Sequence, residues 1–214
     1  MNKIVKAGLL MITLVIPALI FAFLQLFATN HYAIPYFNPE LDPSGKVLIM
    51  NKDTVFKKQS ELAFTELPQN VSRGISLKGN ATLINYLPAN CDQSCDIIVD
   101  QLKRVIALTE SIDNLKLITF TDSSHTNNVL KERKQIDSRN WSFYAISNME
   151  RDKIFIDNLH FDQHSILVRA SFPIYMVVLL DSNGYFRGYY KLNDLAETDR
   201  LMAELKVLEY EKEH

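Results

Sequence analysis

An uncharged apolar run near the N-terminus divides the chain into two parts that need different surroundings. No charged residue occurs from Gly8 to Ala28. As an α-helix, this run would be roughly 30 Å long, which matches the hydrocarbon core of a bilayer. Because the run is apolar on every face, it is a poor match for a helix that packs in a soluble core. The sequence therefore predicts an N-terminal membrane-spanning helix, a signal anchor, within residues 1–28.

The charges that flank this run predict which side of the membrane holds the rest of the chain. Lys3 and Lys6 precede the run, and the next basic residue is Lys46. This bias places the N-terminus in the cytoplasm and the remaining residues on the exported side. A cleaved signal peptide fits less well, because its apolar core is shorter and its cleavage site carries small residues, whereas bulky Leu26 stands at one of those positions here.

The exported part is predicted to be a linker followed by one domain. Residues 29–45 contain Pro35, Pro39 and Pro43 and have no clear period, which is typical of a linker. Residues 46–214 are numerous enough for a single domain with its own core. The formal net charge of −2 provides no basic field, so the composition argues against nucleic-acid binding.

Hydrophobic periodicity in residues 46–214 predicts strands that alternate with helices. We expect a hairpin at 46–57, strands at 81–88, 115–122 and 141–146, helices at 96–109 and 127–136, a hairpin at 172–190, and a last helix with an Asp194/Glu197 capping box. Strands that alternate with helices, followed by a hairpin, predict an α/β domain with a mixed sheet flanked by helices. This is the element order of a thioredoxin-like fold.

The chain contains two cysteines, Cys91 and Cys95, in a CxxxC spacing. They lie between a predicted strand and a predicted helix, which is where the working cysteines of thioredoxin-like folds are found. A purely structural disulfide would close only a short loop here. It would stabilise the fold by about 2 kcal/mol, against about 4.7 kcal/mol for a 100-residue loop. A structural role is therefore the least useful one for the pair, and we expect two thiols that are exposed and paired with each other.

Two kinds of chemistry suit these thiols. The dipole at a helix N-terminus favours the thiolate, which is the form that attacks disulfides, so the pair suits thiol–disulfide exchange. Asp92 and Asp96 beside the cysteines oppose this effect. Two soft thiolates also suit Cu(I), which would need a third ligand. A structural zinc site would need four ligands, and the sequence holds no second cysteine pair.

A third copper ligand would come from the five histidines of the chain. His31 lies in the predicted linker and His214 is the last residue, so both are poor candidates. His125 follows a predicted strand at its C-terminal end, where the sites of α/β sheets gather. His160 and His164 lie shortly before the final hairpin. The sequence leaves His164 and His125 as the candidates.

Several stretches together resemble the Sco/SenC family. They are the N-terminal anchor, the strand that leads into CxxxC, "LITFTDSSHTNNVLKERKQIDSRNWSFYAIS", "VVLLDSNGYFRGYY", and "NHYAIP", which is similar to bacterial members. The family comprises membrane-anchored thioredoxin-fold proteins that bind copper and help to assemble the copper centre of cytochrome c oxidase. The resemblance covers most of residues 29–210. It implies a bacterial inner-membrane protein with its domain in the periplasm and an oxidase subunit as client.

The resemblance implies that Cys91 and Cys95 match the copper-binding cysteines of the family. The family's third ligand is a histidine before the D-x-x-G turn, and Phe172-Pro173 stands at that place here. Pro173 instead resembles the cis-proline that packs beside the active cysteines of thioredoxin.

The resemblance therefore predicts a divergent Sco-like protein that assists copper-site assembly through its thiol pair. Two alternatives stay open. One is an exported thiol–disulfide oxidoreductase without stable copper binding, and the other is a degenerate family member that acts only by binding a partner.

Overall fold

The computed structural model describes residues 3–27, 33–88, 93–122, 139–164 and 175–213. Contacts divide the chain into two units, Met1–Ala33 and Ile34–His214. The first unit contains helix α1 (Lys3–Phe27). Within the described part of the chain, no helix is both long and apolar enough to cross a membrane.

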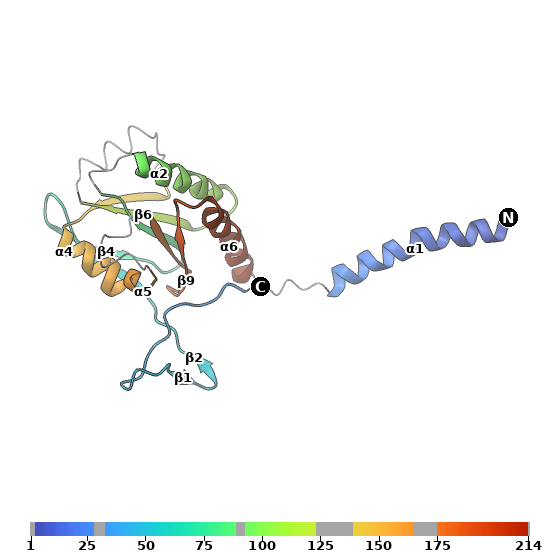
Figure 1. Ribbon diagram of the computed structural model, residues 1–214, viewed down its shortest axis with the longest axis horizontal. Helices are drawn as coiled ribbons and strands as arrows, with labels where there is room; N and C mark the ends of the chain where they lie inside the picture. Colours follow the sequence, from blue (N-terminus) through green and yellow to red (C-terminus); the bar gives the residue numbers. More distant parts are fainter. Residues whose placement is uncertain (1–2, 28–32, 89–92, 123–138, 165–174, 214) are drawn as a thin grey trace. The chain divides into compact units, whose positions relative to one another are not determined.

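Two small hairpins precede the main sheet of the second unit (Figure 1). Strand β1 (Ile49–Met50) pairs with β2 (Asp53–Thr54), which confirms the first hairpin predicted from the sequence. Strand β3 (Glu61–Glu66) pairs with β4 (Val71–Ser76), and the sequence reading had missed this hairpin. Along β3, Leu62 and Phe64 are buried, whereas Glu61 and Ala63 are exposed.

A mixed sheet of five strands forms the centre of the domain, in the order β7-β6-β5-β8-β9. Its strands are β5 (Ala81–Tyr86), β6 (Leu115–Thr121), β7 (Trp141–Ala145), β8 (Met176–Leu180) and β9 (Phe186–Lys191). Strands β5, β6 and β7 are parallel, whereas β8 runs antiparallel to both β5 and β9. The predicted thioredoxin-like sheet is confirmed.

Helices follow the strands that the sequence predicted, with additions before β8. They are α2 (Gln93–Ile106) with its extension η1 (Ala107–Glu110), α4 (Asn148–Asp152), the π-helical η2 (Lys153–Asn158), α5 (Phe161–His164) and α6 (Leu195–Glu213). The helical segment 148–164 was not predicted, and the helix expected at 127–136 lies outside the described residues.

The start of α6 keeps one half of the expected capping box. The Asp194 side chain accepts a hydrogen bond from the backbone N–H of Ala196 at 2.9 Å. The Glu197 carboxylate, expected to bond back to the cap residue, instead accepts from Arg200 at 2.8 Å. A single side-chain cap therefore marks this helix start, and an ion pair one turn later replaces the reciprocal bond.

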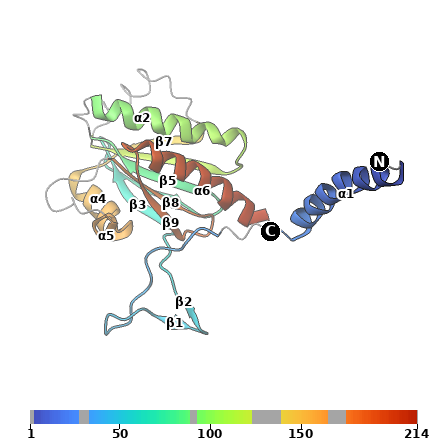
Figure 2. The same ribbon diagram turned by 45° about the vertical axis from the view of Figure 1, so that its right-hand side comes forward.

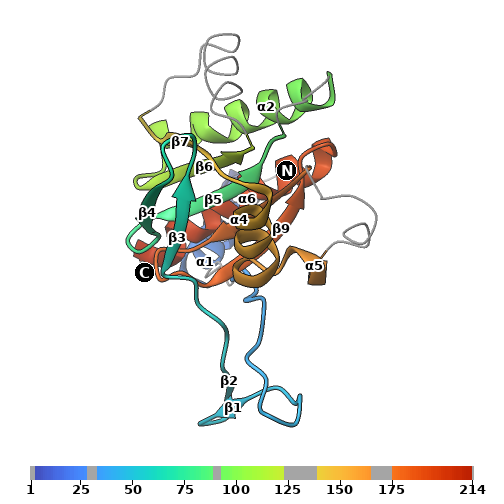
Figure 3. The ribbon, with the colours of Figure 1, turned by 90° about the vertical axis from the view of Figure 1, so that its left-hand side faces the viewer.

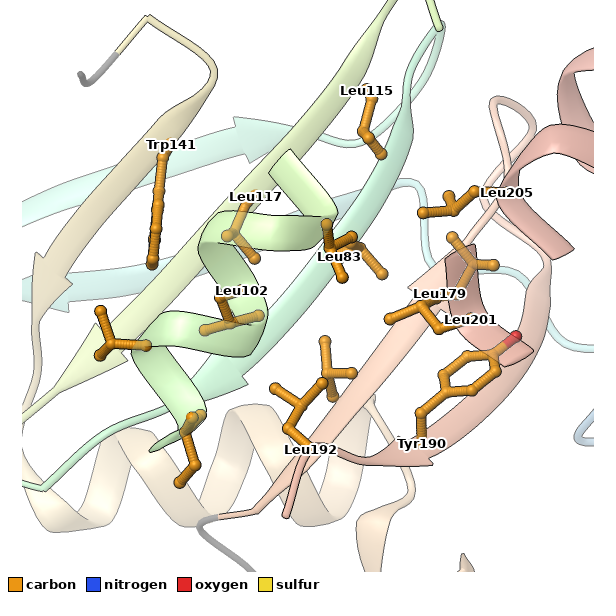
Figure 4. Close-up of a cluster of buried hydrophobic side chains, with 14 of the residues drawn as sticks. Leu83, Leu102, Leu115, Leu117, Trp141, Leu179, Tyr190, Leu192, Leu201 and Leu205 are labelled. Carbon is orange, nitrogen blue, oxygen red and sulfur yellow. The ribbon is translucent and has the colours of Figure 1, made fainter. Parts of the chain in front are cut away.

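Alternation along the strands sends apolar side chains to both faces of the sheet. On β5, Leu83 packs in one buried cluster and Ile84 in another. Helices α2 and α6 cover the first face, and η2, α5 and β3 cover the second (Figures 2 and 3). Figure 4 shows the first cluster, in which Leu102 of α2 and Leu201 and Leu205 of α6 lie over Leu83, Leu117 and Leu179 of the sheet. Burial on both faces explains why these strands read as nearly continuous apolar runs.

The segment that the sequence suggested as a linker is tied to the domain from Ile34 onward. Ile34 is buried, and its backbone N–H donates to the carboxylate of Glu211 at 2.7 Å. The backbone N–H of Phe37 donates to the carbonyl of Phe186 at 2.9 Å. Residues 34–45 therefore belong to the unit that contains the sheet.

Candidate thiol–disulfide site

The carboxyl ends of the three parallel strands define one edge of the sheet. Register places Tyr86 of β5 beside Phe120 of β6, and Thr121 of β6 beside Ala145 of β7. Helix α2 follows β5 at this edge. Because β8 runs the other way, its first residues lie at the same edge. Open α/β sheets place their sites here, so the edge is the first place to look for chemistry.

Cys95 lies in the first turn of α2 and takes part in a disulfide. The one other cysteine in the sequence is Cys91, which lies outside the described residues. The expectation of two exposed thiols is wrong for Cys95, whose exposed fraction is 2%. The reason is helical periodicity, since Cys95, Ile98 and Leu102 share the face of α2 that packs on the sheet.

A chain of buried polar side chains crosses the sheet on the face that α2 covers. The indole Nε1–H of Trp141 on β7 donates to Thr119 Oγ1 on β6 at 2.8 Å. Thr119 in turn bonds to Oδ1 of Asn85 on β5, also at 2.8 Å. Asn85 and Thr119 are fully buried. Polar groups in such positions need partners, so this chain fixes the orientation of each side chain.

The opposite face of the same edge carries a second polar group, Tyr86. Burial, together with the nearby carboxylate of Asp122, raises the pKa of its phenol to about 12. The guanidinium of Arg151 on α4 lies 5.6 Å from the centre of the Tyr86 ring and opposes this rise. Tyr86 is therefore protonated at neutral pH, and it serves as a hydrogen-bonding group without a charge.

Most of the remaining predicted site residues are not placed. His125 and Pro173 lie outside the described residues, as does the side chain of His164. His160 is described, and its ring lies 5.7 Å from that of Phe186 on β9. Among the described residues, no three His, Cys, Asp or Glu side chains are grouped to hold a metal ion. The third copper ligand stays a prediction.

A polar cavity of about 320 Å³ lies at the opposite end of the sheet. Asp181, Arg187 and Glu211 are among its lining residues. Arg187 pairs with both carboxylates, at 3.1 Å and 2.6 Å. Arg187 is therefore held by two carboxylates, and the described residues that line the cavity include no cysteine, so the edge that carries Cys95 is the better candidate for thiol chemistry.

Solved structures share this arrangement of sheet and helices. A SCO1/SenC family lipoprotein from Bacillus anthracis str. Ames matches with a TM-score of 0.54 and 16% identity, over 71% of this chain and 94% of that chain. BsSco, described as a member of the Sco family of cytochrome c oxidase assembly proteins, matches with a TM-score of 0.55 and 15% identity, over 83% and 98% of the two chains. The chain has a Sco-like thioredoxin fold.

The comparison of sequences gives no such match. Neither a protein-family profile nor a curated protein matches this chain. The likeness to Sco proteins is therefore one of fold, at 15–16% sequence identity. The structure does confirm that a helix follows β5, and it places Cys95 in the first turn of that helix.

Within the Sco-like fold, sequence reasoning missed the buried polar chain. The strands "ATLINY" and "LKLITFT" place Asn85, Thr119 and Thr121 on the same face as apolar neighbours. Polar residues at core positions of two adjacent strands were the available signal, because buried polar groups need partners or a purpose. Trp141 opens β7, and the only polar atom of its side chain bonds to this group.

Proposed function

We propose that this chain is a membrane-anchored, Sco-like protein that exchanges disulfides with an exported client during copper-site assembly of a respiratory oxidase. The observation that carries this proposal is the disulfide of Cys95 in the first turn of α2. A sulfur at a helix N-terminus is a good leaving group, because the dipole stabilises its thiolate. The class of client is suggested by the description of BsSco as an oxidase assembly protein.

Burial of Cys95 assigns different roles to the two cysteines. Because its side chain is 2% exposed, a client thiolate attacks the sulfur of Cys91 instead. A bond forms between the client sulfur and Cys91, the Cys91–Cys95 bond breaks, and its electron pair leaves on Cys95 as a thiolate. A second client thiolate then attacks the first client sulfur and releases Cys91 as a thiolate. The client loses two electrons and this protein gains two; the reverse sequence reduces a client disulfide.

Copper is the proposed cargo of the reduced state. Thiolates are the copper ligands, so the oxidised pair offers none and reduction supplies two. His164 or His125 is proposed as the third ligand. This order of events makes redox exchange a condition for metal binding, and it explains why both chemistries belong to one site.

The redox proposal is tested by exposing single-cysteine variants to glutathione disulfide. Cys95→Ser, which keeps Cys91, is expected to form a mixed disulfide that mass spectrometry detects. Cys91→Ser, which keeps the buried Cys95, is expected to react far more slowly. Equal reactivity of the two variants would contradict the assigned roles. A wild-type potential below about −300 mV without exchange would identify an inert structural bridge.

Copper binding has a separate test. The reduced protein is titrated with Cu(I) in competition with a chromophoric chelator, beside Cys91→Ala. Wild type is expected to take copper from the chelator and the variant is not. If both bind equally little, the copper role is lost and the thiol oxidoreductase stands alone. If neither copper nor thiol exchange is found, the chain acts by binding a partner.

Membrane anchoring rests on the uncharged run from Gly8 to Ala28. The full chain, expressed in a bacterium, is expected to stay with the membranes after alkaline carbonate extraction and to be cut by protease added to the periplasm. The double variant Ile16→Lys/Ile20→Lys places two charges in the run and is expected to be extracted. Extraction of the unmodified chain would refute the anchor without affecting the redox test.

A further inference from the structure

The direction of the buried hydrogen-bond chain follows from the chemistry of its members. Trp141 Nε1 is a donor only, so Thr119 Oγ1 accepts from it at 2.8 Å. The single hydroxyl proton of Thr119 is then free to be donated, and the partner at 2.8 Å is Oδ1 of Asn85. The carbonyl oxygen of the Asn85 amide therefore faces Thr119. The amide nitrogen must lie on the other side of the planar group.

This arrangement leaves the amide nitrogen of Asn85 without an acceptor among the described residues. The side chain is fully buried, so water does not replace the missing bond at the surface. A buried donor without a partner is rare and costs free energy. The hydroxyl of Thr121, on the next strand, is likewise buried and has no hydrogen-bond partner in the described part of the chain.

Both unsatisfied groups lie on the sheet face that is covered by the buried cluster containing Cys95. Along β5, Leu83 and Leu87 flank Asn85 on that face, and both pack in the buried cluster that contains Cys95. On β6, Leu117 belongs to the same cluster and shares its face with Thr121. The opposite neighbour of Asn85 on β8 is Val177, which offers no side-chain acceptor. Cys95 is thus the member of this cluster whose sulfur changes in its ability to accept a hydrogen bond when the disulfide is reduced.

We propose that the side-chain amide of Asn85 is the hydrogen-bond donor that stabilises the sulfur of Cys95 when the disulfide is reduced. A disulfide sulfur is a weak acceptor, whereas a thiolate is an anionic and strong one. The unmade bond therefore penalises the oxidised form, and its formation favours the reduced form. The inference rests on the proposed function, in which this disulfide exchanges with thiols.

The equilibrium with glutathione measures this preference. Two molecules of reduced glutathione supply two electrons, the Cys91–Cys95 bond breaks, and two protein thiols and one glutathione disulfide form. Replacing Asn85 by Leu or by Val removes the donor at two different side-chain volumes. Each variant is expected to shift the equilibrium about tenfold towards the protein disulfide, or about 30 mV more negative.

Thr82→Val is the matched control. Thr82 is a buried hydroxyl residue on the same strand, near its opposite end, and its hydroxyl donates to the carbonyl of Asn80 at 3.4 Å. This variant is expected to leave the equilibrium constant within twofold of wild type. Emission from Trp141, the one tryptophan of the chain, checks that each variant is folded.

Unfolding of the oxidised and the reduced forms closes the thermodynamic cycle. If Asn85 donates only to the reduced sulfur, Asn85→Leu is expected to destabilise the reduced form more than the oxidised form. The difference should equal the factor by which the glutathione equilibrium shifts. A purely structural Asn85 would destabilise both forms equally and leave the glutathione constant within twofold, which overturns the inference. Failure of the wild-type disulfide to react with glutathione at all would instead overturn the proposed function.

Discussion

Arg187 donates a hydrogen bond from Nη2 to the carbonyl oxygen of Ile34 at 2.7 Å, across 153 residues of sequence. The same guanidinium pairs with Asp181 at 3.1 Å and Glu211 at 2.6 Å, and its side chain is 3% exposed. One buried cation therefore joins the first residue of the folded unit, the turn after β8 and the end of α6. Its charge is matched by two carboxylates, which is the condition for keeping an ion inside a protein.

Replacement of Arg187 by Met is expected to lower the free energy of unfolding by about 3–5 kcal/mol, because it leaves the buried carboxylate of Asp181 without its counter-charge. Denaturant titration measures the loss. Arg73→Met is the control, since Arg73 pairs with Glu66 at an exposed site and its removal is expected to cost less than about 1 kcal/mol. Similar losses in the two variants would contradict the role assigned to burial.

Gly184 occupies the turn between β8 and β9 with a φ of +84°, and a Cβ there would lie 2.6 Å from the carbonyl oxygen of Gln59. Gly79 has almost the same φ, +81°, but open space around its Cβ position. Gly184→Ala is therefore expected to lose about 1–3 kcal/mol more stability than Gly79→Ala, because backbone atoms must move to admit the methyl group. Thermal unfolding of the two variants separates the cost of the close contact at Gly184 from the cost of the positive φ, which both positions share. Equal losses of stability would show that the contact adds no cost.

His160 provides a pH prediction. Burial lowers the pKa of its imidazole, Lys57 lowers it further, and Asp162 and Asp157 oppose this change. A depressed folded-state pKa means that protonation favours unfolding, so this contribution to stability is present above the unfolded pKa of about 6.5 and is lost as the pH falls through the folded value.

The test compares wild type with His160→Asn, because asparagine tolerates the positive φ of 54° at this position. The free energy of unfolding is measured at about pH 7.5 and about pH 5, on either side of the ordinary imidazole value. The variant is expected to lose less stability than wild type on acidification. An equal or larger loss in the variant would show that His160 is not responsible.

The sequence predicted the sheet well because its strands are buried on both faces. Leu83 and Ile84 point to opposite sides and are both apolar, so the run around them could only be a core strand. The helix after Cys95 was equally clear from its period. The β3–β4 hairpin was missed because β4 is largely exposed and carries little apolar pattern. The segment 148–164 was missed because it breaks into short helical pieces with a π-helical turn, which keep no single period.

The sequence predicted where Cys95 lies in the fold, but it did not predict that this residue is buried. Spacing alone put Cys95 at the start of a helix after a strand, and the structure confirms this. Its burial was not predicted, although the helical period was the available signal, since Cys95 lies three residues before Ile98 on the apolar face of α2. The predicted ligands His125 and His164 and the predicted cis-proline at Pro173 stay predictions, since the described residues do not include their side chains.

The sequence by itself determined the order of elements and the position of the cysteine motif, because periodicity and turn residues are local properties of the chain. Only the tertiary structure decided what lies beneath that motif. Asn85, Thr119 and Trp141 come from three strands that are separated along the chain, and parallel pairing brings them into one hydrogen-bonded row. The tertiary structure thus shows a buried Cys95 and an unsatisfied Asn85 amide on the same side of the sheet. No short stretch of sequence predicts this, because strand register decides which side chains become hydrogen-bond partners.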